Sequence, residues 1–112
     1  MIMEKKRIGD FGEEAACRYL IKQNYIIRER NFRMKCGEID IIASKNGVLV
    51  FVEVKTRLFE SCGSGAESVT AAKRQRIRRC ALCYMAICQK HFDAVDFQVI
   101  EISADHLEGL EF

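Results

Sequence analysis

The chain has 112 residues, 49% of them hydrophobic, and a formal net charge of +2 at pH 7. These values predict one globular domain with a modest core and exclude both a large multidomain enzyme and a protein dominated by charge. No apolar run is long enough to cross a membrane and the N-terminal residues lack the apolar stretch of a signal peptide, so we expect no membrane partner. We therefore expect a cytoplasmic protein whose six cysteines stay reduced.

Residues 4–24 are predicted to form the first helix. Apolar side chains recur there at helical spacing, at Ile8, Phe11, Ala15, Ala16, Tyr19 and Leu20. Gly9 and Gly12 lie in the first turns, where glycine lowers helix stability by up to about 1 kcal/mol each and can permit close approach of another backbone. Residues 25–32 are predicted as the first strand, and residues 33–36 as a polar connection.

Residues 37–57 are predicted to form a β-hairpin. An alternating run is followed by a β-branched and apolar run at 48–54. Between them, Asn46-Gly47 is the pair that best tolerates the positive φ angles of a type I′ turn. A two-residue turn places Lys45 opposite Val48 and thereby fixes the register of the whole hairpin.

This register has a chemical consequence, because it places Asp40 directly opposite Glu53. Two facing carboxylates repel by up to about 1 kcal/mol, and a hard cation such as Mg²⁺ between them would remove that cost. Lys55 shares a face with Glu53 because the two are two residues apart. Asp followed by Glu-x-Lys on the next strand is a constellation for metal-assisted phosphodiester hydrolysis. The alternative is a partly exposed hairpin in which Glu38, opposite Lys55, forms an ordinary cross-strand salt bridge.

Residues 59–65 have the small, flexible composition of a mobile loop or a plain connector. A second helix is predicted over residues 70–90, with Ser68 or Thr70 as its N-cap. Its apolar stripe, which should pack on the sheet, contains Ile77, Cys80, Ala81, Tyr84, Ile87 and Cys88. Lys73 lies on the same stripe in the first turn, and a lysine aimed at the core is a candidate to reach an active site or a phosphate.

Cations flank that stripe on both sides, Arg74 and Arg78 on one and Arg76 and Arg79 on the other. Residues 70–92 contain no acid, so these arginines favour phosphate contacts over a merely solvated face. On the opposite side of the helix a small apolar patch is either a homodimer contact or without function; it consists of Leu82, Met85 and Ala86.

Residues 93–102 are predicted as the last strand, with Val95, Phe97 and Val99 on one face. Because a long helix precedes it, this strand should run parallel to the one at 48–55. The folded core should therefore span about residues 4–102, and residues 103–112 form an acidic tail.

Four residues have the ligand spacing of a zinc knuckle: Cys80, Cys83, Cys88 and His91. All four lie within one continuous helical pattern, in which the first and last would lie about 16 Å apart along the axis. That distance is too long for one ion, so we predict no structural zinc.

Five short motifs resemble those of the YraN family of bacterial proteins, which is assigned by similarity to the restriction-endonuclease-like PD-(D/E)xK superfamily, near archaeal Holliday junction resolvases. They are Gly12-Glu13-x-x-Ala16, Arg30-Asn31-Phe32, Gly37-Glu38-Ile39-Asp40, Phe51-Val52-Glu53-Val54-Lys55-Thr56-Arg57, and Lys73 with its following basic residues. The resemblance covers about residues 8–99 and implies a single restriction-endonuclease-like α/β domain. That domain would have a mixed four-stranded sheet flanked by helices, in the order α-β-β-β-α-β.

Together, the resemblance and the hairpin motif lead us to expect a nuclease that hydrolyses DNA, with branched or structured DNA as one substrate class. Asp40 and Glu53 would hold Mg²⁺ or Mn²⁺, and Glu13 is implied by the resemblance alone to assist directly or through water. Lys55 would orient or help deprotonate the attacking water and stabilise developing charge. The nucleic-acid contacts are expected from Lys73, Arg74, Arg76, Arg79 and Arg57. The alternative is a non-catalytic nucleic-acid-binding module with a vestigial nuclease site.

Overall fold

The computed structural model describes residues 5–57 and 70–103. These residues form two helices and four strands in the predicted order α-β-β-β-α-β. The elements are α1 (Lys5–Lys22), β1 (Ile26–Met34), β2 (Gly37–Lys45), β3 (Val48–Thr56), α2 (Ala71–Ile87) and β4 (Ala94–Ile102). The expected loop at 59–65, the alternative cap Ser68 and the acidic tail from residue 104 lie outside the described residues.

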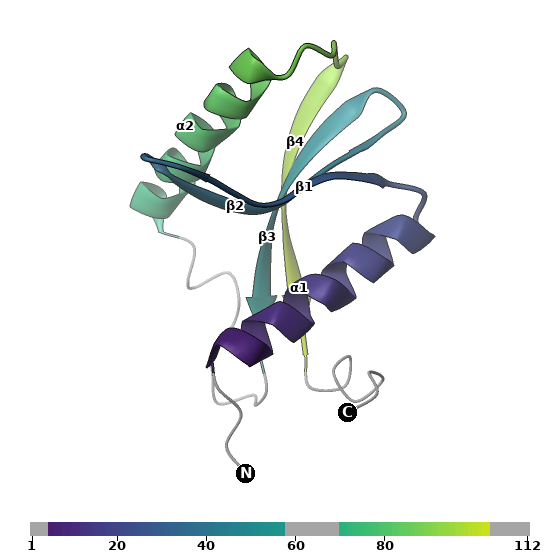
Figure 1. The fold of residues 1–112 in the computed structure, drawn as a ribbon, viewed down its shortest axis with the longest axis vertical. Helices are drawn as coiled ribbons and strands as arrows, with labels where there is room; N and C mark the ends of the chain where they lie inside the picture. The colour runs from purple at the N-terminus through teal and green to yellow at the C-terminus, as the bar shows by residue number, and fades with distance from the viewer. Residues whose placement is uncertain (1–4, 58–69, 104–112) are drawn as a thin grey trace.

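The four strands form one mixed sheet in the order β1-β2-β3-β4. β1, β2 and β3 pair antiparallel, whereas β4 pairs parallel with β3, as the intervening helix predicts. The two helices lie on opposite sides of the sheet (Figure 1). No helix in the described part of the chain is long and apolar enough to cross a membrane.

The β2–β3 hairpin follows its predicted turn and register. Asn46 and Gly47 have φ angles of 50° and 80°, so both occupy the left-handed region that a type I′ turn requires. Pairing runs from Lys45 opposite Val48 to Ile41 opposite Val52, as predicted. The turn therefore fixes which side chains of β2 and β3 point to each face.

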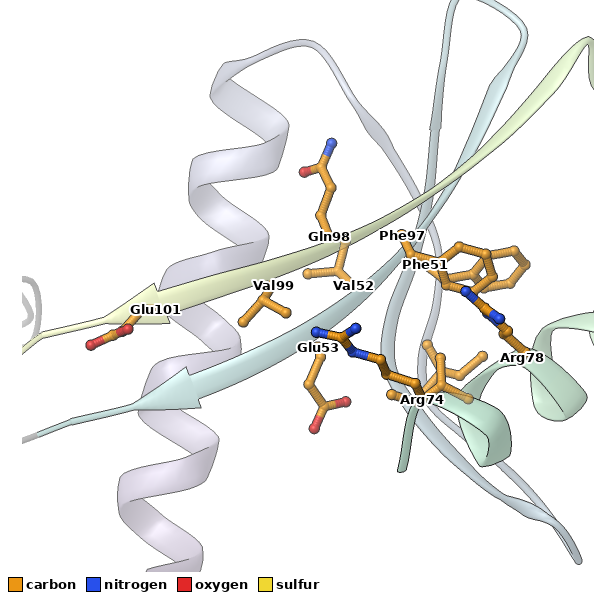
Figure 2. A pocket seen from close by; sticks show the side chains of 11 residues that line it. Phe51, Val52, Glu53, Arg74, Arg78, Phe97, Gln98, Val99 and Glu101 are labelled. Carbon is orange, nitrogen blue, oxygen red and sulfur yellow. The ribbon is translucent and has the colours of Figure 1, made fainter. Parts of the chain in front are cut away.

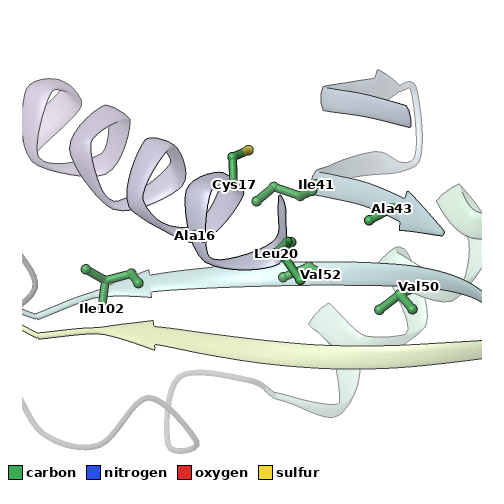
Figure 3. Close-up of a cluster of buried hydrophobic side chains, with 8 residues drawn as sticks. All are labelled: Ala16, Cys17, Leu20, Ile41, Ala43, Val50, Val52 and Ile102. Atoms are coloured by element: carbon green, nitrogen blue, oxygen red, sulfur yellow. The ribbon is translucent and has the colours of Figure 1, made fainter. Parts of the chain in front are cut away.

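Each face of the sheet has its own apolar cluster. Under α1, Ala16, Cys17 and Leu20 pack on the sheet residues Ile41, Ala43, Val50, Val52 and Ile102 (Figure 3). Under α2, the buried cluster contains Ile39, Ile42, Leu49, Phe51, Cys80, Ala81 and Tyr84. Since β4 lies at an edge of the sheet, its Val95, Phe97 and Val99 stay 39%, 45% and 48% exposed.

The first half of the chain departs from prediction in three details. α1 ends at Lys22 rather than 24, and Tyr19 of its predicted stripe is half exposed while Cys17 is buried. β1 extends to Met34 instead of ending at 32. Gly12 does permit a close approach, but of a side chain rather than a backbone: a Cβ at this position would collide with Thr56 of β3.

α2 begins as predicted and ends early. Thr70 is its N-cap, and the Thr70 Oγ1 accepts a hydrogen bond of 3.1 Å from the Lys73 backbone N–H. The helix ends at Ile87, three residues before the predicted 90, and Ile87 is exposed rather than packed on the sheet. Cys88 and His91 consequently lie beyond the helix, so the prediction that all four ligands lie along one helix is wrong, and the axial distance no longer separates Cys80 from His91. The absence of structural zinc stays a prediction.

The proposed outer patch of α2 is exposed, with Leu82 at 65% and Met85 at 41%. Whether a second copy covers it stays a prediction.

Candidate active site

The β2–β3 ladder stops one pair before Asp40 and Glu53. The last backbone pair is Ile41 opposite Val52, so the backbone pairing does not extend to Asp40 and Glu53, although the charge of Glu53 still acts on Asp40. Instead, the backbone N–H of Val54 donates a 2.7 Å hydrogen bond to Asp40 Oδ2. The carboxylate of Asp40 thus takes the place of a backbone acceptor on the neighbouring strand.

The strand β2 rotates at this point. In a regular strand, residues two apart share a face, yet Ile39 packs in the cluster under α2 and Ile41 in the cluster under α1. Asp40 lies between these two residues, and the rotation turns its side chain toward β3, where it meets the backbone N–H of Val54. The sequence of residues 38–41 alternates between acidic and apolar residues without a break, so it did not predict this rotation.

Glu38 has moved away from Lys55 as a result. It pairs with Arg33 across the β1–β2 ladder, and the two side chains form a 3.0 Å salt bridge. The alternative of a Glu38–Lys55 cross-strand salt bridge is therefore wrong, because the two residues no longer face each other.

Glu53 and Lys55 share a face, as their spacing predicts, and Lys73 joins them from α2. The Glu53 Oε1 atom lies 2.7 Å from Lys73 Nζ and 3.6 Å from Lys55 Nζ. The three side chains are only 12%, 28% and 17% exposed for Glu53, Lys73 and Lys55. The prediction that Lys73 turns inward to the hairpin is confirmed, and its N-capped first turn holds it there.

The two lysines differ in their electrostatics. Burial lowers the pKa of Lys55, and the neighbouring Lys73 ammonium lowers it further. Burial is the largest single effect on Lys73 and opposes its charge, but the hydrogen bond to Glu53, the contact with Lys55 and the charges of Glu53 and Asp40 together outweigh it and raise the pKa of Lys73. Lys73 is therefore the ammonium that neutralises Glu53, and Lys55 is the amine that loses its proton more readily.

Asp40 is surrounded by carboxylates. Burial raises the pKa of Asp40 to about 7, and the charges of Glu53, Glu13 and Glu38 add to the shift, whereas the hydrogen bond from Val54 opposes it. Burial also raises the pKa of Glu13 on α1, and Asp10, Glu38 and Glu53 contribute to the increase. Glu13 thus lies in the electrostatic field of the hairpin carboxylates, as the resemblance implies.

A divalent cation fits the chemistry of these donors. Glu13 Oε1 is buried and has no hydrogen-bond partner within residues 5–57 and 70–103, and such an oxygen is costly unless a cation or water meets it. Asp40, Glu53 and Glu13 could supply the oxygen ligands that Mg²⁺ and Mn²⁺ prefer. Within the described residues, however, no three acidic, histidine or cysteine side chains converge closely enough to hold an ion. Binding would require the carboxylates to close in on the cation.

The predicted nucleic-acid contacts fall into two groups. Arg74 and Arg78 are exposed and line a cavity of about 520 Å³ between α2 and the strands β3 and β4, which Glu53 also lines (Figure 2). Arg76 and Arg79 are exposed but do not line it. Arg57 is half buried just beyond β3, where its backbone N–H donates to the Ile102 carbonyl oxygen.

The aromatic part of this cavity was not predicted from the sequence. Phe51 and Phe97 stack with ring centroids 5.4 Å apart, and both line the cavity beside Glu53. The alternation of β4 placed Phe97 on one face with Val95 and Val99, but could not show that α2 leaves this face uncovered. A second hollow also went unpredicted; it is lined by Gly9, Asp10, Glu13, Asn31, Arg33 and Glu38.

The fold and the site define a class: a small α/β domain in which a central hairpin and both helices gather carboxylates and lysines at one place. The family model described as "Uncharacterised protein family UPF0102" matches residues 12–102. The chain belongs to this family, which is the YraN family that its motifs resemble.

Individual relatives agree over most of the chain. A UPF0102 protein of Symbiobacterium thermophilum is 45% identical over 97 residues, which are 87% of this chain and 82% of the relative. A UPF0102 protein of Clostridium perfringens is 43% identical over 107 residues, or 96% and 87% of the two chains. One from Dictyoglomus turgidum is 40% identical over 100 residues, or 89% and 85%.

Proposed function

We propose that this protein hydrolyses phosphodiester bonds of DNA with Mg²⁺ or Mn²⁺ in the cytoplasm. The observation that carries the proposal is the meeting of Asp40, Glu53 and Lys55 at one edge of the hairpin, next to Lys73. Carboxylates hold hard cations, and a lysine with a lowered pKa is better able to accept a proton near neutral pH. The restriction-endonuclease-like resemblance of the same motifs points to the same chemistry.

Each residue has a distinct role in this proposal. Asp40 and Glu53 would hold the ion, with Glu13 assisting directly or through water. The bound ion would polarise the phosphate and lower the pKa of an attacking water. Lys55 would orient that water, help remove its proton and stabilise the charge that develops on the phosphate oxygens.

The surrounding cations would hold the DNA. Lys73 lies beside the carboxylates, where it can meet the phosphate at the site, and the exposed arginines of α2 extend the positive surface outward. Such phosphate contacts position the nucleic acid without reading its sequence. We include Arg57 in this surface because it follows the Glu-x-Lys motif directly.

One observation favours a second candidate, a nucleic-acid-binding module without catalysis. Glu53 is already neutralised by Lys73 and contacted by Lys55, so its carboxylate could be a structural partner of α2 rather than a metal ligand. In that case the arginines would still bind phosphates and no bond would be cut.

Strand cleavage separates the two candidates. The parent protein is incubated with duplex, flap and four-way-junction DNA, with Mg²⁺, with Mn²⁺ and with a chelator, and the products are resolved on denaturing gels. Metal-dependent cleavage that Asp40→Asn and Glu53→Gln both abolish supports the nuclease. DNA binding without cleavage under either metal leaves the binding module.

A further inference from the structure

The cavity beside the site has a stacked aromatic wall. Phe97 lies against Phe51 with ring centroids 5.4 Å apart and an angle of 26° between the ring planes. Phe51 is buried, whereas Phe97 is 45% exposed. One side of the Phe97 ring is thus covered by Phe51, and the rest of the side chain is accessible and lines the cavity (Figure 2). A further flat ring could continue this stack.

The mouth of the same cavity is cationic. Arg74 and Arg78 are four residues apart on α2, so they lie on one side of the helix, and Figure 2 shows both side chains reaching toward the strands β3 and β4. Two acids also line the cavity. Glu53 is neutralised by Lys73, and Glu101 lies along β4 away from the Phe51–Phe97 pair (Figure 2).

We propose that this cavity binds one unpaired nucleotide of the DNA, with its base on Phe97 and its phosphates between Arg74 and Arg78. The proposal rests on the proposed function, because Glu53 belongs to both the cavity and the candidate metal site and so places this nucleotide next to the phosphate that is cut. Aromatic side chains beside cations bind unpaired bases of any sequence, since every base has a flat π-face. The cavity, at about 520 Å³, is within the usual range for a site that encloses a small molecule.

The proposal names a substrate class. In an intact duplex both faces of a base are covered by its neighbours, so a base can lie on Phe97 only where the DNA is single-stranded, frayed or branched, or after the base is unstacked at a cost. The preferred substrate is therefore DNA with unpaired nucleotides next to the cleavage point, and uninterrupted duplex is a poor one.

The exposed apolar face of β4 could instead bind a second copy of this chain. A two-fold contact across this face would place the rim arginines of both copies, Arg74 and Arg78, in one interface. Such like-charge contacts oppose association, whereas they attract a phosphate backbone. The charge of the rim therefore favours nucleic acid.

The test uses fluorescence in the presence of a chelator, so that nothing is cut. The chain contains no tryptophan, so Phe97→Trp introduces a single tryptophan at the proposed stacking position. Titration with duplex carrying a single-stranded overhang should quench its emission, and titration with blunt duplex of equal length should not. Leu82→Trp, on the exposed outer face of α2, is the matched control and should respond to neither DNA.

Affinity gives the second readout. Phe97→Leu keeps an apolar side chain but removes the flat ring, and should weaken binding of the overhang DNA by about 5- to 150-fold, the range for one base–aromatic stack. Its affinity for blunt duplex should stay within about twofold. Equal quenching by both DNAs, or unchanged overhang affinity in Phe97→Leu, would overturn the proposal. So would a dimeric parent that Phe97→Leu converts to monomer without any change in DNA binding, because this face would then be an interface between copies.

The outcome also separates this inference from the proposed nuclease function. Selective binding of overhang DNA in chelator, without cleavage under Mg²⁺ or Mn²⁺, supports the nucleotide site and overturns only the catalytic function. Metal-dependent cleavage of blunt duplex and overhang DNA at equal rates overturns the nucleotide site and leaves the nuclease. Absence of any DNA binding overturns both.

Discussion

Lys73 Nζ and Glu53 Oε1 lie 2.7 Å apart and connect the first turn of α2 to β3. The pair means that α2 contributes a charge to the site as well as a packing surface. It also sets a condition for metal binding, because any cation at Glu53 must share the carboxylate with Lys73 and Lys55 or displace them. Whether the site cuts DNA or only binds it depends on that competition.

Removing the Lys73 charge should raise the pKa of Lys55. The Lys73 ammonium is one cause of the lowered pKa of Lys55, after burial, and in Lys73→Gln the amine of Lys55 would also become the main partner of Glu53. NMR titration of the lysine side chains in parent and variant measures the shift directly. Arg79→Gln, which removes an exposed cation elsewhere on α2, should leave the Lys55 titration unchanged. An unaltered Lys55 titration in Lys73→Gln would show that the two amines are not neighbours in solution.

Asp40→Asn should stabilise the metal-free protein, and more at pH 8 than at pH 5. The pKa of Asp40 is about 7 in the folded protein against an ordinary value of 3.8, so the folded state binds the proton more tightly than the unfolded state does. Its contribution to stability therefore falls as the pH rises from about 4 to 7, and the full cost applies above pH 7. The amide still accepts the bond from Val54 but carries no charge, so we expect a gain in the free energy of unfolding of up to about 4 kcal/mol at pH 8, the amount that a pKa shift of this size implies, measured by urea unfolding at both pH values.

Added metal ions should stabilise the parent protein but not Asp40→Asn. Millimolar Mg²⁺ or Mn²⁺ should raise the Tm of the parent at pH 8, because a ligand that binds the native state stabilises it, and should not raise that of Asp40→Asn. Glu29→Gln, at an exposed position of β1, serves as the control and should behave like the parent. If Mg²⁺ or Mn²⁺ raises the Tm of the parent and of Asp40→Asn equally, Asp40 is not a metal ligand.

Local chemistry explains which parts of this structure could be predicted. Asn46-Gly47 specifies a type I′ turn, and the turn specifies the register up to Ile41 opposite Val52. Likewise, the cap at Thr70 and the helical period after it specify that Lys73 faces the sheet. In these cases, residues close in sequence determine the geometry, so one amino-acid sequence is enough to predict it.

The failures arise where distant residues decide the outcome. The rotation of β2 at Asp40 depends on its hydrogen bond to Val54 on another strand, which no periodicity within β2 reveals. Alternation places Phe97 on a face of β4, but only the position of α2 determines that this face stays open. The site residues were therefore identifiable by type and spacing, whereas the cavity beside them was not.

Gly12→Ala should destabilise the protein because α1 approaches β3 too closely for a side chain. A Cβ at Gly12 would collide with the side chain of Thr56, whose branched Cβ leaves it little room to move. We expect a loss of about 1–3 kcal/mol, measured by urea unfolding, and partial recovery in Gly12→Ala/Thr56→Ala. Gly9→Ala is a control on the same helix, since, apart from its chain neighbours and the helix's own backbone, no atom of residues 5–57 and 70–103 lies within 4 Å of its Cβ position. It should be neutral or stabilising by up to about 1 kcal/mol; an equal loss at both glycines would contradict the packing argument.

Lys55→Ala should reduce cleavage without reducing DNA affinity. Its proposed role is exercised mainly in the transition state, and an interaction made only there affects the rate rather than binding. We expect single-turnover cleavage to slow by at least about 100-fold, the usual scale for one acid–base or electrostatic group, with the Kd within about threefold of the parent. If affinity and rate fall together, Lys55 is a phosphate clamp and its catalytic role is wrong.

Replacing Arg76 and Arg79 together by glutamine should weaken DNA binding and reduce its dependence on salt. Both side chains are exposed on α2 and lie outside the cavity that Arg74 and Arg78 line, so their contribution should be to the phosphate backbone alone. Each lost phosphate contact lowers the slope of log K against log salt by nearly one unit, so the slope should flatten by about 1 to 2 units on duplex and overhang DNA alike. The control, Arg18→Gln/Lys22→Gln, removes two exposed cations from α1 and should leave the slope unchanged. If both double variants flatten the slope equally, DNA binding follows net charge rather than the surface of α2, and the proposed interface is wrong.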